Sequence, residues 1–368
     1  MPRLRPRYLL TALTVLLPLI ALLLASALLT GILFRSPANA GVPTGPGAVS
    51  TLFGIPGTSG SADTTLRATF NGPAGECYDA AGNLYVTDGA GNKIRKVSPS
   101  GVVTTLAGSG TGAETDGSGA AASFNGPAGI CLASDGNLYV TDSTGNKIRK
   151  LTLAGVVTTL AGSGTTASTD GSGAAASFYN PWGICQASDG TLTVTDYGSN
   201  DVRRVSLSGA VSTLYGVPGT SGSADTTGRA TFYSPAASCY DAAGNLYVAD
   251  QTNNKIRKIS PTGVVTTLAG SGSAGNTDGS GAGATLNCPT GITQASDGNL
   301  YVADYVGNTI RKVTLAGAVT TLAGSGSSTE TDGTGSGASF KNPYGITQAS
   351  DGNLYVTDGG GNKIRKPR

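Results

Sequence analysis

Short alternations of hydrophobic and polar residues fill most of the chain, and Gly, Asn or Asp residues separate them. Segments such as LYVTD place successive side chains on opposite faces with the period of two that a β-strand requires. In one part of the chain this pattern predicts four strands, over Ala128–Ala133, Asn137–Asp142, Lys147–Leu151 and Val156–Leu160. The connections between these runs are only a few residues long, which indicates antiparallel hairpins.

The pattern repeats with a constant period. Segments related to VVTTLAG begin at residues 48, 102, 156, 210, 264 and 318, which are 54 residues apart. Each unit also carries a Gly- and Ser-rich stretch and a Phe-x-x-Pro motif, in which Leu286 replaces Phe in the fifth unit. Four-stranded antiparallel sheets repeated at this spacing predict a β-propeller. Its units are residues 48–101, 102–155, 156–209, 210–263, 264–317 and 318–368.

The two ends of the repeated region predict that the ring closes. Val49–Phe53 is a fourth-strand segment that precedes any first strand, and the segment 364–368 ends a third strand that no fourth strand follows. The N-terminal segment therefore fits as the outer strand of the last blade, where it would cover an exposed sheet edge. The predicted fold is all-β, a six-bladed propeller of four-stranded antiparallel blades closed by the N-terminal strand.

Three motifs recur in register: Pro-x-Gly-Ile, then GNLYVTD, then NKIRK. This order closely resembles the NHL repeat over residues 48–368. The resemblance implies a propeller scaffold, used by relatives to bind proteins, RNA or other ligands, and it does not imply one activity. The chain departs from the family pattern where the namesake His follows the Asn. Those positions hold Lys93, Lys147, Asp201, Lys255, Thr309 and Lys363.

The first forty residues differ from the repeats. Arg3, Arg5 and Arg7 precede an uncharged, Leu-rich stretch that ends before Arg35, and the small residues of Ala38–Ala40 suit signal peptidase. Residues 1–40 are expected to be a cleaved signal peptide or an uncleaved N-terminal membrane anchor, followed by a linker over residues 41–47. Either form predicts an exported propeller, in the periplasm, outside the cell or at the cell surface, that touches a membrane only through this segment.

Charge and composition narrow the function. The whole chain has 24 basic and 22 acidic residues, and four of the Arg lie in residues 1–40, so the propeller is slightly acidic. This balance does not favour nucleic acid as a partner. The chain has no His, which removes a Ser-His-Asp triad and the His-dependent lyases and lactonases among similar propellers.

An enzyme remains as an alternative function. A metal-dependent lactonase-like hydrolase of this fold uses carboxylate and Asn ligands, but the chain has only three Glu residues, Glu76, Glu114 and Glu330. No acidic set converges on one place in the predicted ring. We therefore predict no catalytic residue, no cofactor and no metal site.

Several polar residues recur in every unit. An Asp ends each second strand, as Asp142 does, and an Asn follows four residues later, as Asn146 does. We expect these residues to make turns, with the Asp accepting backbone N–H bonds in the turn that follows it and the Asn in a left-handed conformation. The third-strand Arg, such as Arg149, should pair with a carboxylate or lie in solvent. Asp116 and its equivalents should cap a short Ala-rich turn.

Two kinds of inner-strand residue are candidates for a special role. Glu76 replaces an Ile that four other units carry, and we expect it to lie in a solvated axial channel, although a buried Glu would mark a site. Cys77 and its equivalents in the next three units share one inner-strand position. We expect these Cys to be free packing residues, because neighbouring inner strands are too far apart for disulfides.

A ligand is expected on the face that carries the long loops, because loops provide binding residues more often than strands do. Non-repeated aromatic residues gather there, and two of them, Trp182 and Tyr344, occupy the same position in opposite blades. The predicted binding residues are Tyr179, Trp182, Tyr197, Tyr233, Tyr305 and Tyr344. Exposed aromatic residues suit a protein or carbohydrate partner, and packing at blade edges is the alternative explanation.

Overall fold

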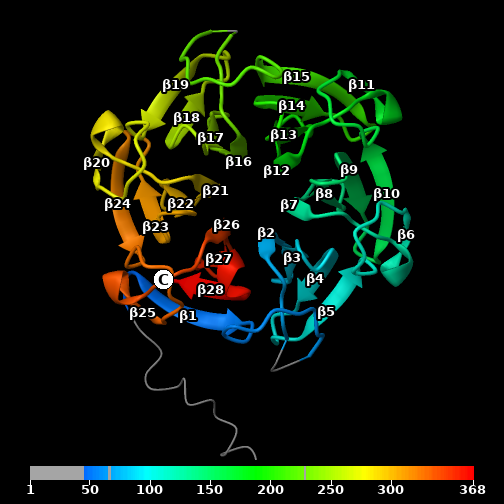
Figure 1. The fold of residues 1–368 in the computed structure, drawn as a ribbon, viewed down its shortest axis with the longest axis horizontal. Helices are drawn as coiled ribbons and strands as arrows, with labels where there is room; N and C mark the ends of the chain where they lie inside the picture. The colour runs from blue at the N-terminus through cyan, green and yellow to red at the C-terminus, as the bar shows by residue number, and fades with distance from the viewer. Residues whose placement is uncertain (1–44, 65–67, 228) are drawn as a thin grey trace, which may run out of the picture. The chain divides into compact units, whose positions relative to one another are not determined.

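The computed structural model describes residues 45–64, 68–227 and 229–368, and the predicted signal or anchor over residues 1–40 lies outside them. The described residues form six antiparallel sheets arranged as blades around a central axis (Figure 1). This arrangement confirms the predicted six-bladed, all-β propeller. No helix among these residues is long and apolar enough to cross a membrane.

Each blade has four long strands, which in blades 1 to 5 run in chain order from the axis outward. Blade 1 contains β2 (Pro73–Tyr78), β3 (Leu84–Asp88), β4 (Lys93–Val97) and β5 (Val103–Ala107). Blade 2 contains β7 (Pro127–Leu132), β8 (Leu138–Asp142), β9 (Lys147–Leu151) and β10 (Val156–Ala161). Blade 3 contains β12 (Pro181–Gln186), β13 (Leu192–Asp196), β14 (Asp201–Val205) and β15 (Ala210–Gly216).

The second half of the chain repeats this order. Blade 4 contains β16 (Pro235–Tyr240), β17 (Leu246–Asp250), β18 (Lys255–Ile259) and β19 (Val265–Ala269). Blade 5 contains β21 (Pro289–Gln294), β22 (Leu300–Asp304), β23 (Thr309–Val313) and β24 (Ala318–Ala323). Blade 6 contains β26 (Pro343–Gln348), β27 (Leu354–Asp358), β28 (Lys363–Pro367) and, from the other end of the chain, β1 (Ala48–Phe53).

β1 closes the ring. It pairs antiparallel with β28, with Val49 opposite Pro367 and Thr51 opposite Arg365. The Arg368 N–H also donates to the carbonyl of Ala48 across 2.9 Å. The blue and red ends of the chain therefore lie side by side in one blade, as predicted (Figure 1).

Four blades carry a fifth, two-residue strand outside the outer one, which the repeat pattern did not predict. These strands are β6 (Gly117–Ser118), β11 (Gly171–Ser172), β20 (Gly279–Ser280) and β25 (Gly333–Thr334). Each is followed by a short 3-10 helix: η1 (Gly119–Ala121), η2 (Gly173–Ala175), η3 (Gly281–Gly283) or η4 (Gly335–Gly337). A fifth, η5 (Gly359–Gly361), lies in blade 6. Blades 1 and 4 lack the extra strand, and the loops entering them carry the PGTSGSADTT variant.

The core lies between the blades rather than within any one of them. Between blades 1 and 2, Tyr85 and Ile94 pack against Ile130, Leu138 and Val140, and all are nearly excluded from solvent. Each apolar face of a sheet is thus covered by the next sheet. Repetition around a closed ring leaves no apolar face uncovered in the described blades.

The repeated Asn residues link successive blades. Asn146 has a φ of 54°, the left-handed conformation expected for it, and the other five Asn have φ between 52° and 61°. The side-chain carbonyl of Asn146 accepts the N–H of Asn180 in the loop that enters the next blade, across 2.8 Å. Equivalent bonds of 2.8–2.9 Å occur at all six Asn, including Asn362 back to Gly72.

The repeated Asp and Arg residues form an ion-pair network inside each blade. Asp142 accepts the N–H of Asn125, which lies upstream in the entering loop. The sequence had predicted a bond with the turn that follows Asp142, so the partner differs from the prediction. Asp116 does not cap the 3-10 turn, because its carboxylate binds Arg149 at 2.8 Å and the N–H of Thr159 at 3.0 Å. That prediction was wrong: the cap position at Ser118 makes no side-chain bond.

Two faces of the ring follow from this topology. The long-loop face carries the loops between each outer strand and the next inner strand, together with the Asp-to-Asn turns. The short-turn face carries the tight turns, such as Ala349–Gly352 between β26 and β27, where the Gly352 N–H donates to the carbonyl of Ala349 across 3.0 Å.

Candidate functional site

The inner strands approach one another closely at their third position. Five blades have Gly there, and blade 4 has Ala237. A Cβ atom placed on Gly183 would lie 2.5 Å from the carbonyl oxygen of Ala236, and one on Gly291 would lie 2.5 Å from that of Tyr344. The small residues therefore keep the channel narrow. As a consequence, side chains at the preceding position can meet across the axis.

Trp182 of β12 and Tyr344 of β26 do meet there. Their ring centroids are 5.5 Å apart with an angle of 22° between the planes, which is a stacked pair. Tyr197 lies 5.5 Å from Trp182, and Tyr305 lies 4.7 Å from Tyr344. We call these four residues the aromatic cluster. Each of the four residues is half-buried.

The other two predicted residues do not join the cluster. Tyr179 and Tyr233 are 47% and 43% exposed, and no ring contact connects either of them to the other aromatic residues of the described chain. Both lie where the entering loops meet the inner strands, and their backbone N–H groups bind Asp196 and Asp250 at 2.8 Å. They are surface residues of the same face.

Trp182 and Tyr344 line a cavity of about 50 Å³ together with small residues such as Ala74, Gly129 and Thr290. Because the two rings already stack on each other, a ligand at this cavity would rest against them and not insert between them. Burial, with Tyr305 as a smaller contribution, raises the pKa of Tyr344, so its hydroxyl stays protonated and can donate a hydrogen bond.

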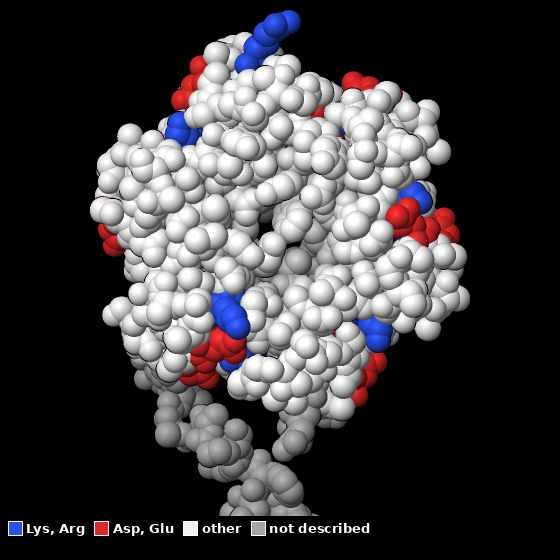
Figure 2. Space-filling model, in the orientation of Figure 1, with Lys and Arg blue, Asp and Glu red and all other residues white. Residues whose placement is uncertain are grey.

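Uncharged polar groups surround the cluster. Ser143 donates to the side-chain carbonyl of Asn180, and the Asn342 amide donates to the carbonyl of Tyr305 across 3.4 Å. Figure 2 shows no charged residues inside the central hollow; those in view lie over the blades and at the rim. The hollow therefore offers aromatic surface and neutral hydrogen-bonding groups to a ligand.

Glu76 is buried, contrary to the expectation of a solvated axial position. It is only 8% exposed, and neither carboxyl oxygen has a hydrogen-bond partner among the described residues. The fourth position of an inner strand faces the neighbouring blade, where Ile130 is packed in the equivalent place. Burial raises the pKa of Glu76 well above its ordinary value.

The five Cys residues are free thiols. Burial raises the pKa of Cys185 to about 11, and its thiol lies 3.4 Å from the Ser238 hydroxyl. A protonated thiol is a poor nucleophile and a poor metal ligand. Within the described ranges, no three His, Cys, Asp or Glu side chains gather in a way that could hold a metal ion.

The comparisons with known proteins agree with the repeat pattern. The profile of the NHL repeat matches residues 124–151 and 286–313. The chloroplastic protein SUPPRESSOR OF QUENCHING 1 of Arabidopsis thaliana is 31% identical over 283 residues, which cover 72% of this chain and 27% of that protein. NHL repeat-containing protein 2 of Bos taurus is 31% identical over 288 residues, which cover 68% of this chain and 40% of that protein. The chain thus spans less than half the length of either relative.

A solved propeller supports the architecture. An auxiliary nutrient binding protein from Bacteroides thetaiotaomicron superimposes with a TM-score of 0.66 over 86% of this chain and 75% of that one, at 17% identity. At this identity the likeness shows the fold alone. Six repeats in register, a ring closed by β1 and the match to the NHL repeat lead to one conclusion: the chain belongs to the NHL-repeat family of six-bladed β-propellers.

Proposed function

We propose that this propeller is an exported binding module that holds a protein or carbohydrate partner on its long-loop face, at the aromatic cluster. The observation that carries the proposal is the stacking of Trp182 on Tyr344 across the axis. Four other blades have Ala or Thr at that position, so the ring can be built without aromatic residues there. Packing between blades therefore does not require this pair.

The surroundings of the cluster favour binding over chemistry. Half-buried Trp and Tyr side chains provide large contact areas with little loss of conformational freedom, which is why they dominate binding energies at many interfaces. The neutral groups around them, such as Ser143 and Asn180, can satisfy hydroxyl or amide groups of a partner. The auxiliary nutrient binding protein has the same fold, so a binding role is compatible with the scaffold.

Capture of a partner from the native cell envelope, together with screening on a glycan array, tests this function. The test variant is Trp182→Ala with Tyr344→Ala, and the matched control is Tyr179→Ala with Tyr233→Ala, which removes two aromatic residues of the same face outside the cluster. The test variant should lose binding while it remains folded. If it folds and still captures the partner as well as wild type, the cluster is not the site.

A further inference from the structure

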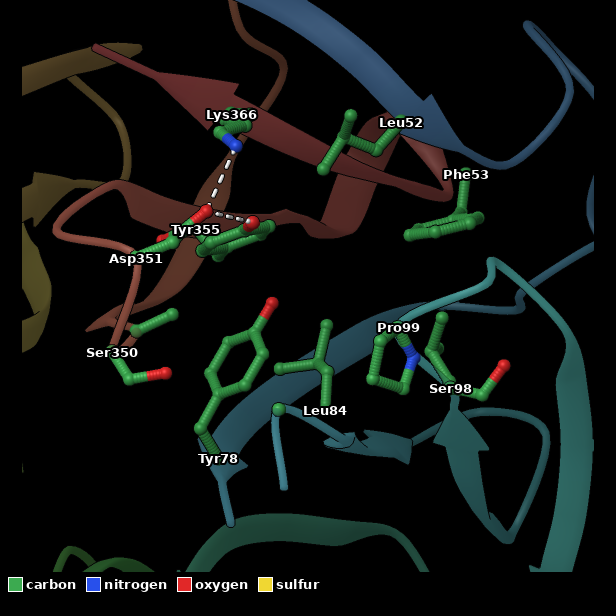
Figure 3. A pocket seen from close by; sticks show the side chains of 13 residues that line it. Leu52, Phe53, Tyr78, Leu84, Ser98, Pro99, Ser350, Asp351, Tyr355 and Lys366 are labelled. Atoms are coloured by element: carbon green, nitrogen blue, oxygen red, sulfur yellow. Dashed lines mark hydrogen bonds and ion pairs between the residues drawn. The ribbon is translucent and has the colours of Figure 1, made fainter. Parts of the chain in front are cut away.

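A second cavity lies between blade 6 and blade 1, away from the aromatic cluster. Its volume is about 310 Å³, which is at the lower end of roughly 300–1,000 Å³ for small-molecule sites. Figure 3 shows Phe53, Tyr78, Leu84 and Pro99 around the space. Tyr78 and Tyr355 form one wall with ring centroids 4.9 Å apart. The walls are thus mostly apolar and partly aromatic.

Blade 1 departs from the Gln-bearing blades beside this cavity. Blades 3, 5 and 6 end their inner strands in Gln, and two of these Gln close the gap between blades. Gln186 accepts the Ser134 N–H of the preceding blade across 2.8 Å, and Gln348 accepts that of Ser296 across 2.7 Å. Blade 1 has Tyr78 at this position. The opposing Ser350 is exposed and lines the cavity, and its N–H has no protein acceptor in the described chain.

The charged groups at the rim neutralise each other. Asp351 Oδ2 accepts hydrogen bonds from Lys366 at 3.0 Å and from the Tyr355 hydroxyl at 2.9 Å. Asn353 donates two further hydrogen bonds to this carboxylate, from its backbone N–H to Oδ1 across 3.0 Å and from its side-chain amide to Oδ2 across 2.8 Å. A ligand in this cavity therefore meets no unpaired charge of the protein. A charged ligand would lose its hydration against the apolar walls, which costs free energy, so the cavity favours a neutral ligand.

Blade 4 also has a Tyr, Tyr240, at the end of its inner strand, which provides a comparison. In the interface between blades 3 and 4, Thr193 stands in the place of Tyr355, and the Tyr240 hydroxyl lies 2.8 Å from its side chain. A cavity of about 310 Å³ occurs there too, but it is lined by residues such as Tyr215 and Gly263, and neither Tyr240 nor Ser188 contributes to it. The combination of a paired aromatic wall with a free N–H donor is thus particular to the closure between blades 6 and 1.

We propose that this cavity binds a small, neutral, planar aromatic molecule that carries a carbonyl group. The aromatic ring lies against Tyr78 and Tyr355, and the carbonyl oxygen accepts the Ser350 N–H. The site is separate from the aromatic cluster, and it does not depend on the function proposed for that cluster.

The probe is 2-acetylnaphthalene, a neutral aromatic ketone, with 2-ethylnaphthalene as the analogue that lacks the acceptor. Binding to the full chain is measured by saturation-transfer NMR and by titration of the ketone. The ketone should bind more tightly than the hydrocarbon by roughly tenfold, the value of one hydrogen bond. Equal binding of the two would remove the role assigned to Ser350, and no saturation transfer to either would overturn the proposal.

Ser350→Pro tests the donor directly. Ser350 follows Ala349 at the second position of a tight turn, where Pro is favoured, so the variant removes the N–H and should retain the fold. It should abolish the advantage of the ketone and leave binding of the hydrocarbon unchanged. Ser188→Pro makes the same change in the equivalent turn of blade 3 and should have no effect on either ligand. A retained advantage of the ketone in Ser350→Pro would contradict the proposal.

Tyr78→Gln tests the aromatic wall. The new amide should accept the Ser350 N–H as Gln186 accepts that of Ser134, so the gap closes and both ligands lose binding. Tyr240→Gln is the matched control in blade 4 and should bind the probes as wild type does. Thermal melting of each variant shows whether it is folded. A folded Tyr78→Gln variant that still binds 2-acetylnaphthalene would place the probe elsewhere.

Discussion

Arg149 donates from Nη1 to Oδ2 of Asp142 across 2.7 Å, and neither side chain has any contact with solvent. The second guanidinium nitrogen binds Asp116 of the long loop at 2.8 Å, and the guanidinium lies 5.3 Å from the ring centroid of Phe124. The arrangement joins the third strand, the second strand and the entering loop of one blade. The two ion pairs of the Arg recur in all six blades, and the contact with a Phe ring recurs in five, because Leu286 replaces Phe in blade 5. The network is therefore part of the construction of the ring.

Arg149→Met should therefore be strongly destabilising. The substitution leaves Asp142 buried without its partner, and breaking a buried pair in this way costs about 3–5 kcal/mol. Urea denaturation of the two proteins measures the loss. Lys150→Met is the control, because the Lys150–Asp135 pair is partly exposed and such pairs contribute at most about 1 kcal/mol. Similar losses in the two variants would show that the buried network has no special role.

The regular parts of the ring could be predicted from the sequence because local preferences and the repeat agree. The strand predicted over Lys147–Leu151 has the same bounds in the structure, and Asn146 has the left-handed conformation expected of it. Ring closure by Val49–Phe53 followed from counting strands, since an orphan fourth strand and a blade without one must pair. The Asn decides the conformation of the turn, and the missing fourth strand of the last blade decides how the ring closes.

The partners of polar side chains could not be predicted in the same way. Asp116 is 33 residues from Arg149, and only the path of the long loop brings the two together. The burial of Glu76 could not be predicted, because one strand alone does not show whether its fourth side chain points to the axis or to the neighbouring blade. The stacking of Trp182 on Tyr344 depends on how closely opposite strands approach. The cavity beside Tyr78 was not recognised, although this Tyr interrupts a position at which three blades carry Gln.

Glu76 should make stability depend on pH. Because its folded-state pKa is raised by burial, the folded chain keeps a proton that the unfolded chain releases above about pH 4. The free energy of unfolding should therefore fall as the pH rises from about 4 towards the folded-state pKa. Glu76→Ile, which installs the residue of four other blades, should remove this fall and stabilise the protein at neutral pH.

The measurement is urea unfolding of wild type and Glu76→Ile between pH 4 and 8. The difference between the two isolates Glu76 from the surface Asp residues, such as Asp135, whose pKa is lowered to about 2 and whose contribution is lost only in more acidic solution. Ser238→Ile provides the control in blade 4, because it makes the same replacement without removing an acid. A constant difference between wild type and Glu76→Ile across this range would contradict the assignment.

Ring closure predicts that deleting Val49–Phe53 destabilises the whole propeller by several kcal/mol and promotes aggregation. The deletion removes the hydrogen bonds to β28, uncovers its edge and exposes the core around Val49. Thermal melting and light scattering report both effects. A permuted chain in which residues 45–53 follow Arg368 should recover the stability, because Arg368 already lies beside Ala48. An unchanged melting temperature on deletion would argue against closure by β1.

Export predicts a defined N-terminus for the protein in its native host. Sequencing of the mature chain should begin at Gly41 if the segment is cleaved as a signal peptide, or the intact chain should be found in the membrane fraction. Replacing Ala38 and Ala40 with bulky residues should shift the first outcome to the second. Recovery of full-length soluble protein from the cytoplasm would contradict export.

Trp182 is the only Trp in the chain, so its fluorescence reports on the aromatic cluster alone. Tyr344 covers one face of the indole and Tyr197 contacts it at a tilted angle. Tyr344→Ala should uncover that face to water, shift the emission to longer wavelength and make it more accessible to iodide. Tyr179→Ala, on the same face but outside the cluster, should leave the spectrum unchanged. Aromatic pairs contribute about 0.5–1.5 kcal/mol, so Tyr344→Ala should cost little stability. If its emission matches wild type in a folded protein, the two rings do not stack in solution, and the binding site proposed here loses its foundation.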